Sequence, residues 1–404
     1  MNQPSTTHSH KREKLFTRDF VFITIANLVM AVGFYFLIAL LPLFLKHELH
    51  APESQIGLVL SMYTLAAIIT RPLTGYLLDR LGRKSVYIVS FVAFTLLFLG
   101  YPMVSTIAFM LVLRFLHGAT WGCMNTAGST ISIDIVPHSR RGEGIGIFGL
   151  SMTTALAIGP FIATNLARQT SFRMAFYVAF AVCVGGLLLA LPVKVPKIAH
   201  SGLKFSFKGL FERMAVPASI VIMAYICTYA GVISYAGLYG QSIGIPVLGY
   251  FYIVLAVAII LTRVFAGKIY DHRGPAAILT AGTIFLLIAF PILVYMPNVW
   301  GYHISAFLLG LGFGVQMPTL QAMANEGVPA NRRGASNSTF LTSFDVGMGL
   351  GLLIFGQIAG LKGYSFAYLF GMLWIVLGYI LLITIALPHY RKVKSIGKKT
   401  TSIH

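Results

Sequence analysis

Residues 71–84 read RPLTGYLLDRLGRK, and residues 263–274 read RVFAGKIYDHRG. An arginine, a glycine, an aspartate and a final glycine occur in both stretches at one constant offset of 192 residues, the distance from Arg71 to Arg263. An offset that holds at four distinctive positions indicates that one stretch is a copy of the other.

Two other blocks repeat at the same offset. Residues 136–142 (VPHSRRG) match residues 328–334 (VPANRRG), and the glycines of residues 118–122 match those of residues 310–314. Agreement in three separate blocks is not expected by chance, so the chain is predicted to consist of two halves of common ancestry with a central site between them.

The composition indicates a membrane protein. Of its 404 residues, 57% are hydrophobic and 10% are charged, whereas about 25% charged residues is usual in soluble proteins. The apolar residues form runs longer than about 18 residues, which must be helical in a bilayer because lipid offers no partner to backbone polar groups. The net charge of +19 does not indicate nucleic acid, since the basic residues lie between the apolar runs.

We therefore predict an all-α membrane protein with twelve transmembrane helices in two pseudo-symmetric six-helix halves. The predicted spans are 20–45, 55–78, 85–103, 105–133, 144–167, 174–193, 217–240, 247–269, 276–296, 299–325, 336–360 and 365–388. The predicted organisation is a tail at 1–19, a first half at 20–193, a basic linker at 194–216, a second half at 217–388 and a basic tail at 389–404.

The placement of lysine and arginine predicts the orientation. The two tails and the loops on their side hold 23 of the 30 basic residues, and the opposite loops hold four. Because basic residues accumulate on the cytoplasmic side, we expect both termini to be cytoplasmic. The first apolar run is too long for a signal-peptide core and is expected to be a retained span. The pattern fits a bacterial inner membrane.

Residues 75–84 (GYLLDRLGRK) resemble the signature loop between helices two and three of the major facilitator superfamily, and residues 267–274 resemble its degenerate second copy. The resemblance extends over about residues 15–390. It implies a transporter that works by alternating access, as a monomer in the bilayer with a small-molecule substrate. Within the superfamily the chain is most similar to the twelve-helix drug/proton antiporters.

The resemblance also implies a latch at the cytoplasmic ends of the helices, which would hold the outward-open state against the start of span 336–360. Its residues would be Gly75, Asp79, Arg80, Gly82, Arg83, Gly267 and Asp271. The alternative is that the basic residues of this loop only keep it on the cytoplasmic side.

Three residues are candidates for proton coupling. Asp345 is the acid that lies well inside a span, near the bilayer midplane, where a carboxylate is a functional hypothesis by default. Arg114 and His117 share one face of span 105–133, and the arginine resembles one that is linked to proton coupling in the family. The alternatives are structural: Asp345 would pair with Arg114 or a hydroxyl, and Arg114 would bond backbone carbonyls with His117 packed beside it.

Span 144–167 carries the signal for transport direction. Gly146, Ala155, Gly159, Pro160 and Ala163 fall on the spacing of a helix-five motif of drug/proton antiporters, with alanine replacing two glycines. Pro160 is expected to kink the helix. The second half has leucine after its matching glycine, and this asymmetry favours export, although importers also carry a Gly-Pro pair here.

The resemblance implies that helices one, four, seven and ten line the central site. The candidate lining residues are Asn27, Tyr35, Trp121, Asn125, Tyr225, Tyr229, Tyr235, Gln316 and Gln321. Such apolar and aromatic walls suit an amphipathic solute, while Arg114 leaves an anionic or zwitterionic substrate open.

The favoured function is proton-coupled efflux of a small amphipathic solute or drug. The alternative is a proton-coupled importer of a sugar, carboxylate or peptide-like nutrient, and a different class is a non-transporting membrane sensor or scaffold. The sequence contains no phosphate-binding glycine loop, nucleophile elbow or metal-ligand cluster, so an enzyme, a metal and a cofactor are not expected.

Overall fold

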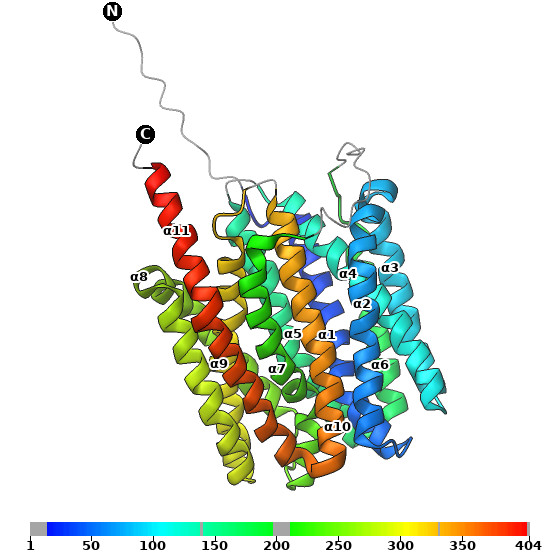
Figure 1. Cartoon of the computed structure of the whole chain (residues 1–404). Helices are drawn as coiled ribbons and strands as arrows, with labels where there is room; N and C mark the ends of the chain where they lie inside the picture. The colour runs from blue at the N-terminus through cyan, green and yellow to red at the C-terminus, as the bar shows by residue number, and fades with distance from the viewer. Residues whose placement is uncertain (1–13, 138–139, 197–210, 330–331, 402–404) are drawn as a thin grey trace, which may run out of the picture.

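The fold is an all-helical bundle, seen here in a computed structural model (Figure 1). The structure describes residues 14–137, 140–196, 211–329 and 332–401, without the side chains of Asp79 and of residues 141–142, 264–273 and 396–401. Its helices are α1 (Arg18–His47), α2 (Glu53–Leu81), α3 (Arg83–Leu97), η1 (Phe98–Met103), α4 (Ile107–Ile135), α5 (Arg141–Gln169), α6 (Phe172–Ala190), η4 (Arg213–Ala215), α7 (Val216–Ser242), α8 (Tyr250–Tyr295), α9 (Val299–Asn325), α10 (Arg333–Leu381), the π-helical η6 (Leu382–Ala386) and α11 (Leu387–Thr401).

Two of these helices each cross the bundle twice. The φ angle is +74° at Gly274 within α8 and +81° at Gly363 within α10, so the chain reverses at both glycines, where a side chain would be strained. Ten described helical segments are long and apolar enough to cross a membrane, and the early part of α8 adds a shorter one. With α10 counted on each side of Gly363, the architecture is consistent with twelve passes.

Several predicted segments fall outside the described residues. They are most of the N-terminal tail (1–19), most of the linker (194–216) and the end of the C-terminal tail (389–404). Within that last tail, α11 continues the helix as far as Thr401. The predicted domain boundaries therefore stay predictions.

The sequence repeat reappears as repeated helix packing. A Cβ atom at Gly118 on α4 would overlap the carbonyl oxygen of Tyr63 on α2, and one at Gly310 on α9 would overlap that of Leu255 on α8. Tyr63 and Leu255 are themselves 192 residues apart. Glycine is needed at both points because the helix backbones touch.

The same packing recurs one turn further along. A Cβ at Gly122 would overlap the Thr70 hydroxyl, and one at Gly314 would overlap the Thr262 hydroxyl, again at the repeat offset. The contact of α2 with α4 therefore has its counterpart in the contact of α8 with α9.

The two halves meet most closely at the end of the bundle opposite the chain termini, called here the far end; the described chain begins and ends at the other, terminal end (Figure 1). Four hydrogen bonds between described residues cross between the halves at the far end. They are His47 Nε2 to Gln241 Oε1 at 2.9 Å, the Tyr364 hydroxyl to Glu53 Oε1 at 3.0 Å, Arg168 Nη1 to the Pro246 carbonyl at 3.2 Å, and the Tyr235 hydroxyl to the Glu53 carbonyl at 3.5 Å.

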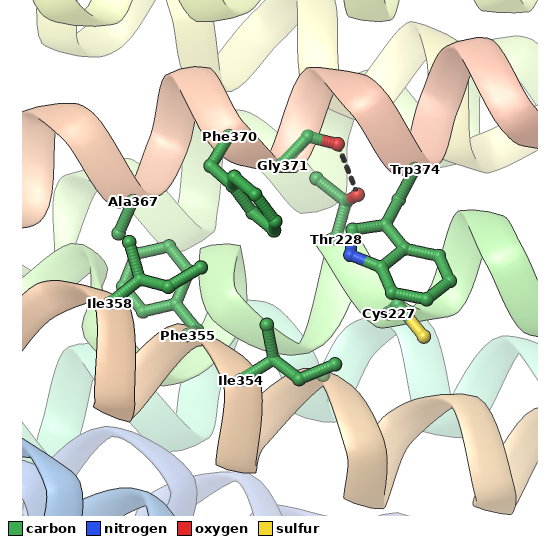
Figure 2. Close-up of a pocket in the computed structure, with 10 residues that line it drawn as sticks. Cys227, Thr228, Ile354, Phe355, Ile358, Ala367, Phe370, Gly371 and Trp374 are labelled. Carbon is green, nitrogen blue, oxygen red and sulfur yellow. Dashed lines mark hydrogen bonds between the residues drawn. The ribbon is translucent and has the colours of Figure 1, made fainter.

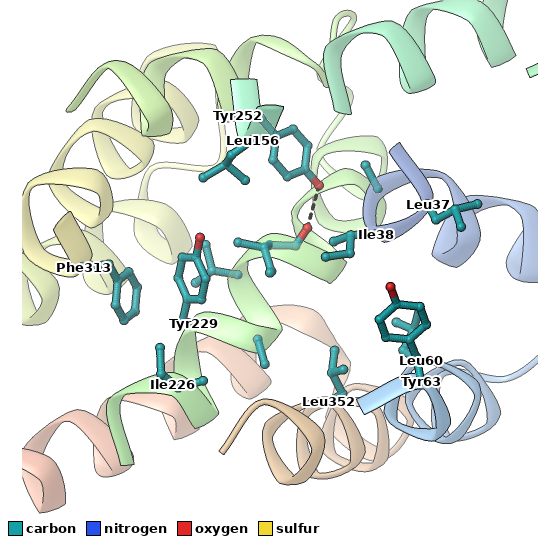
Figure 3. Packing of buried hydrophobic residues seen from close by; sticks show 14 of the residues in the cluster. Leu37, Ile38, Leu60, Tyr63, Leu156, Ile226, Tyr229, Tyr252, Phe313 and Leu352 are labelled. Carbon is teal, nitrogen blue, oxygen red and sulfur yellow. Dashed lines mark hydrogen bonds between the residues drawn. The ribbon is translucent and has the colours of Figure 1, made fainter. Parts of the chain in front are cut away.

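At the terminal end the hydrogen bonds and ion pairs between described residues stay within one half. A Cβ added to Gly75, Gly146 or Gly334 would meet no atom within 4 Å. Between the two ends, Leu37 of α1 and Leu352 of α10 belong to one continuous buried apolar cluster to which both halves contribute (Figure 3). The structure is therefore closed at the far end and separated toward the terminal end.

The repeated glycine contacts predict matched losses of stability. Gly118→Val and Gly310→Val should each cost at least about 1–3 kcal/mol, because overpacking against a backbone cannot relax by a change of rotamer. Thermal unfolding in detergent would measure both losses. Gly185→Val on α6 is the control, since a Cβ there meets open space. A large loss at one glycine and none at the other would show that the two contacts are not equivalent.

Candidate functional site

An ion pair joins the two halves within the bilayer region. Arg71 Nε on α2 lies 2.6 Å from Asp345 Oδ2 on α10, and Arg71 Nη2 lies 3.5 Å from Oδ1. The side chains are 19% and 9% exposed, respectively. Asp345 lies twelve residues into α10, about 18 Å from its terminal end. Both carboxylate oxygens thus face one guanidinium away from bulk solvent.

This pairing differs from both partners that the sequence suggested for Asp345, which were Arg114 and a hydroxyl. The reason is topological. Helix α2 lies between α10 on one side and α4, which carries Arg114, on the other. Arg71 could have been recognised, because it is one of three arginines inside the predicted spans and it anchors the repeat.

Arg114 is buried against an aromatic ring. It is 3% exposed, and its guanidinium carbon lies 4.1 Å from the centre of the Tyr63 ring. Among the described residues no carboxylate pairs with it, and its Nε has no hydrogen-bond partner. The negative face of the Tyr63 ring therefore supplies part of its stabilisation.

His117 is enclosed by aromatic side chains. It is fully buried, its Nδ1 lies 2.8 Å from the Tyr101 hydroxyl, and its ring lies 4.3 Å from that of Phe94 and 4.9 Å from that of Phe98. His117 does not touch Asp345.

Tyr63 lies between the side chains of Arg114 and His117 and the Arg71–Asp345 ion pair. Its hydroxyl interacts electrostatically with Arg114 on one side and with Arg71 and Asp345 on the other. Arg114 and His117 therefore lie in one polar region of the N-terminal half, and Asp345 reaches this region from the C-terminal half through its pair with Arg71.

The predicted lining residues fall into two groups. Most are held within their own half or in the far-end closure: Asn27 Nδ2 donates to Ser151 Oγ at 2.5 Å, Trp121 stacks on Phe34 at 4.1 Å, Gln316 Nε2 lies 3.4 Å from Thr283 Oγ1, Gln321 Nε2 lies 3.3 Å from Asn337 Oδ1, the Tyr225 hydroxyl lies 2.7 Å from Thr283 Oγ1, and the Tyr235 hydroxyl lies 3.5 Å from the Glu53 carbonyl. Asn125 is half-buried, with no hydrogen bond to a described residue.

The second group consists of Tyr35 on α1 and Tyr229 on α7, whose hydroxyls interact electrostatically across the boundary between the halves. Both hydroxyls interact electrostatically with Arg263 on α8. The sequence counted Arg263 among the intramembrane arginines without assigning it a role.

The described latch residues contact their own half. Arg80 Nη1 donates to the Tyr76 hydroxyl at 3.2 Å, and Arg83 forms an ion pair with Asp134 on α4. Gly82, with φ +85°, ends α2. The side chains of Asp79 and Asp271, and Gly267, lie outside the description. The latch remains a prediction for a conformation in which the terminal end is closed.

Gly159 has a matching glycine in the second half, Gly351, whereas Pro160 has no matching proline. A Cβ at Gly159 would press on the Val32 carbonyl of α1, and one at the matching Gly351 would overlap the Cys227 carbonyl of α7. The glycine therefore serves close packing in both halves. Only Pro160 is specific to the first half.

A small apolar groove lies elsewhere, between α7 and α10 (Figure 2). Phe355, Phe370 and Trp374 form its walls, and the Thr228 hydroxyl donates to the Gly371 carbonyl at 2.8 Å. Its lining contains no charged residue and none of the predicted site residues.

Comparison with known proteins gives a consistent family. A family model described as Major Facilitator Superfamily matches residues 23–352. An uncharacterized MFS-type transporter of Methanocaldococcus jannaschii is 25% identical over 376 residues, covering 89% of this chain and 96% of the relative. The staphylopine export protein of Staphylococcus aureus is 23% identical over 369 residues, covering 86% and 92%.

The chain also resembles one relative over a shorter stretch of sequence and one solved structure in its fold. The multidrug resistance protein MdtG of Serratia proteamaculans is 26% identical over 289 residues, covering 66% of this chain and 68% of the relative. The solved structure of a peptide transporter, POT, superimposes with a TM-score of 0.79 at 14% identity, covering 94% of this chain and 97% of that one. At that identity the likeness concerns the fold.

The Arg71–Asp345 pair predicts non-additive mutations. Arg71→Gln or Asp345→Asn leaves the other side chain without its partner, whereas the double variant removes both. A double-mutant cycle on thermal stability should give a coupling energy of roughly 0.5–3 kcal/mol. The same cycle on Arg140 and Glu143, whose pair is more exposed, should give less than about 1 kcal/mol. Additive effects at Arg71 and Asp345 would contradict the pairing.

The contact of Arg114 with Tyr63 predicts a difference between two substitutions. Tyr63→Phe should be nearly neutral in stability, because it keeps the ring and the Tyr63 hydroxyl has no hydrogen-bond partner among the described residues. Tyr63→Leu should cost about 2 kcal/mol or more, since it removes the ring from a desolvated cation. Equal melting temperatures for the two variants would show that the ring does not stabilise Arg114.

Proposed function

The chain belongs to the Major Facilitator Superfamily, and from this premise we propose that it exports a small amphipathic solute across the membrane in exchange for protons. Two observations support export over import. Relatives named for staphylopine export and multidrug resistance align with most or two thirds of the chain, and Pro160 breaks the symmetry of the two halves as in drug/proton antiporters.

The Arg71–Asp345 ion pair is the observation on which the coupling proposal rests. It crosses the boundary between the halves at a buried position. When Asp345 takes up a proton, its charge is lost and Arg71 loses its partner. Removing one partner of a buried pair typically costs about 3–5 kcal/mol, and about 5.5 kcal/mol takes a two-state equilibrium from 1:99 to 99:1. The free-energy change on protonation of Asp345 is therefore large enough to bias the rocking of one half against the other.

The proposed orientation follows from the basic residues. With both termini cytoplasmic, the terminal end faces the cytoplasm and the closed far end faces outward. The separated terminal end then corresponds to a conformation that admits solute from the cytoplasm, with Asp345 charged and paired. The Arg114 guanidinium, which packs on the Tyr63 ring, adds a second positive charge to the same region of the bundle.

Proton coupling is tested in proteoliposomes with an imposed pH gradient and a trapped pH dye. Lipophilic cations, antibiotics, sugars and organic acids would be screened for substrate-dependent proton flux. We expect flux opposite to the movement of the solute, and we expect Asp345→Asn to abolish it because the carrier can no longer take up a proton.

Glu143→Gln is the matched control, since it removes an acid that pairs locally with Arg140, and it should keep the flux of the wild type. Flux in the direction of the solute would establish the importer alternative. Undiminished flux in Asp345→Asn would place the coupling site elsewhere, and a lack of flux and transport across the panel would favour a sensor or scaffold.

A further inference from the structure

The two intramembrane arginines of the repeat have different surroundings. Arg71 and Arg263 occupy equivalent positions, and Arg71 is paired with Asp345 on the opposite half. The position equivalent to Asp345 in the first half is 192 residues earlier, and it is occupied by Thr153 on α5. The position at which an acid would complete a second pair between the halves thus carries a neutral residue.

No described carboxylate takes the place of that acid. Among the residues whose side chains are described, Arg263 forms neither an ion pair nor a hydrogen bond. Asp271 lies eight residues further along α8, a rise of about 12 Å. An arginine without a carboxylate in a membrane span is costly and marks a substrate or ion pathway.

The Arg263 guanidinium lies at the meeting point of both halves. A Cβ at Gly149 on α5 would be 4.0 Å from Arg263 Nη1, and Thr153 follows Gly149 by one helical turn on the same face. The hydroxyls of Tyr35 on α1 and Tyr229 on α7 are close enough to interact with this charge. The exposed Arg263 of α8 therefore faces α5 of the other half, with one tyrosine from α1 and one from α7 within electrostatic range.

The two tyrosines are free to bind a further group. Neither hydroxyl forms a hydrogen bond with a described residue. The ring of Tyr229 packs edge-on against Phe313 at 4.8 Å, and the ring of Tyr35 against Phe34 at 5.0 Å. The charge and the hydroxyls are thus bordered by apolar aromatic surface.

We propose that Arg263, with the hydroxyls of Tyr35 and Tyr229, binds a carboxylate of the transported solute, so that the solute supplies the acid missing from the second pair. This inference rests on the proposed transport function and names its substrate class: an aromatic or otherwise apolar carboxylate. The Arg71–Asp345 pair shows how the equivalent guanidinium accommodates two carboxylate oxygens. Two tyrosine hydroxyls can donate to the remaining lone pairs.

The binding of a carboxylate here would also act on the conformation. Arg263 and Tyr229 belong to the second half, while Tyr35 and Gly149 belong to the first. A bound carboxylate would draw α1 and α5 toward α7 and α8, as Asp345 links α10 to α2. The proton would then act at the Arg71–Asp345 pair and the solute at Arg263, which are equivalent positions between the same two halves.

The test uses the purified full-length protein in detergent and compares carboxylates with their neutral amides. Benzoate, 1-naphthoate and N-acetylphenylalanine, each with its amide, are titrated while thermal stability is recorded. At least one acid should bind the wild type about ten-fold or more tightly than its amide, because hydrogen bonds to a charged group are stronger than those to a neutral one. Equal binding of acid and amide for all three probes would overturn the proposal.

Two variants remove the site in different ways. Arg263→Gln should abolish the preference for the acid by removing the charge. Thr153→Asp should abolish it by supplying an internal carboxylate while Arg263 stays in place, which separates loss of binding from loss of folding. Lys362→Gln is the control, since the Lys362 ammonium packs over the Phe366 ring at the far end. This variant should still bind the acid more tightly than the amide. A folded Arg263→Gln or Thr153→Asp protein that still prefers the acid would contradict the proposal.

These experiments can refute the carboxylate site and the proton coupling separately. The detergent titration needs no gradient and no transport. An acid preference that depends on Arg263 and persists without proton flux would support the carboxylate site and refute the coupling proposal. Proton flux that depends on Asp345, with equal binding of acids and amides, would do the reverse.

Discussion

A carboxylate inside a bilayer must be compensated, and in this chain the compensation comes from the opposite half of the molecule. Asp345 on α10 faces Arg71 on α2, so neither half satisfies its own intramembrane charge at this point. Leaving either partner of a buried pair uncompensated is costly, and the proposed proton coupling rests on this cost.

The duplication accounts for both the similarity and the difference between the halves. Gly118 and Gly310 let two pairs of helices touch in the same way, because a helix contact without side chains between the backbones tolerates no other residue. Charged positions are under no such packing constraint. At the position equivalent to Asp345 the first half carries Thr153, and Arg263 has no carboxylate partner among the described side chains.

Much of the architecture could be predicted from composition and repetition. Long apolar runs dictate helices wherever water is absent, and the constant offset of 192 residues indicated two halves. The helical reversals at Gly274 and Gly363 were less accessible: they appear in the sequence as glycines between apolar runs, and only the backbone shows that the helices continue up to them.

The sequence by itself determined the fold class, the family and the short set of intramembrane charges, because lipid restricts both backbone and charge so strongly. Only the tertiary structure decided which charges meet. Arg114 and Arg71 lie on helices that face different neighbours, so Arg114 packs on Tyr63 while Arg71 reaches Asp345. Partners 274 residues apart are chosen by how helices rotate and pack against one another, and this information is spread over the whole chain rather than held in any local motif.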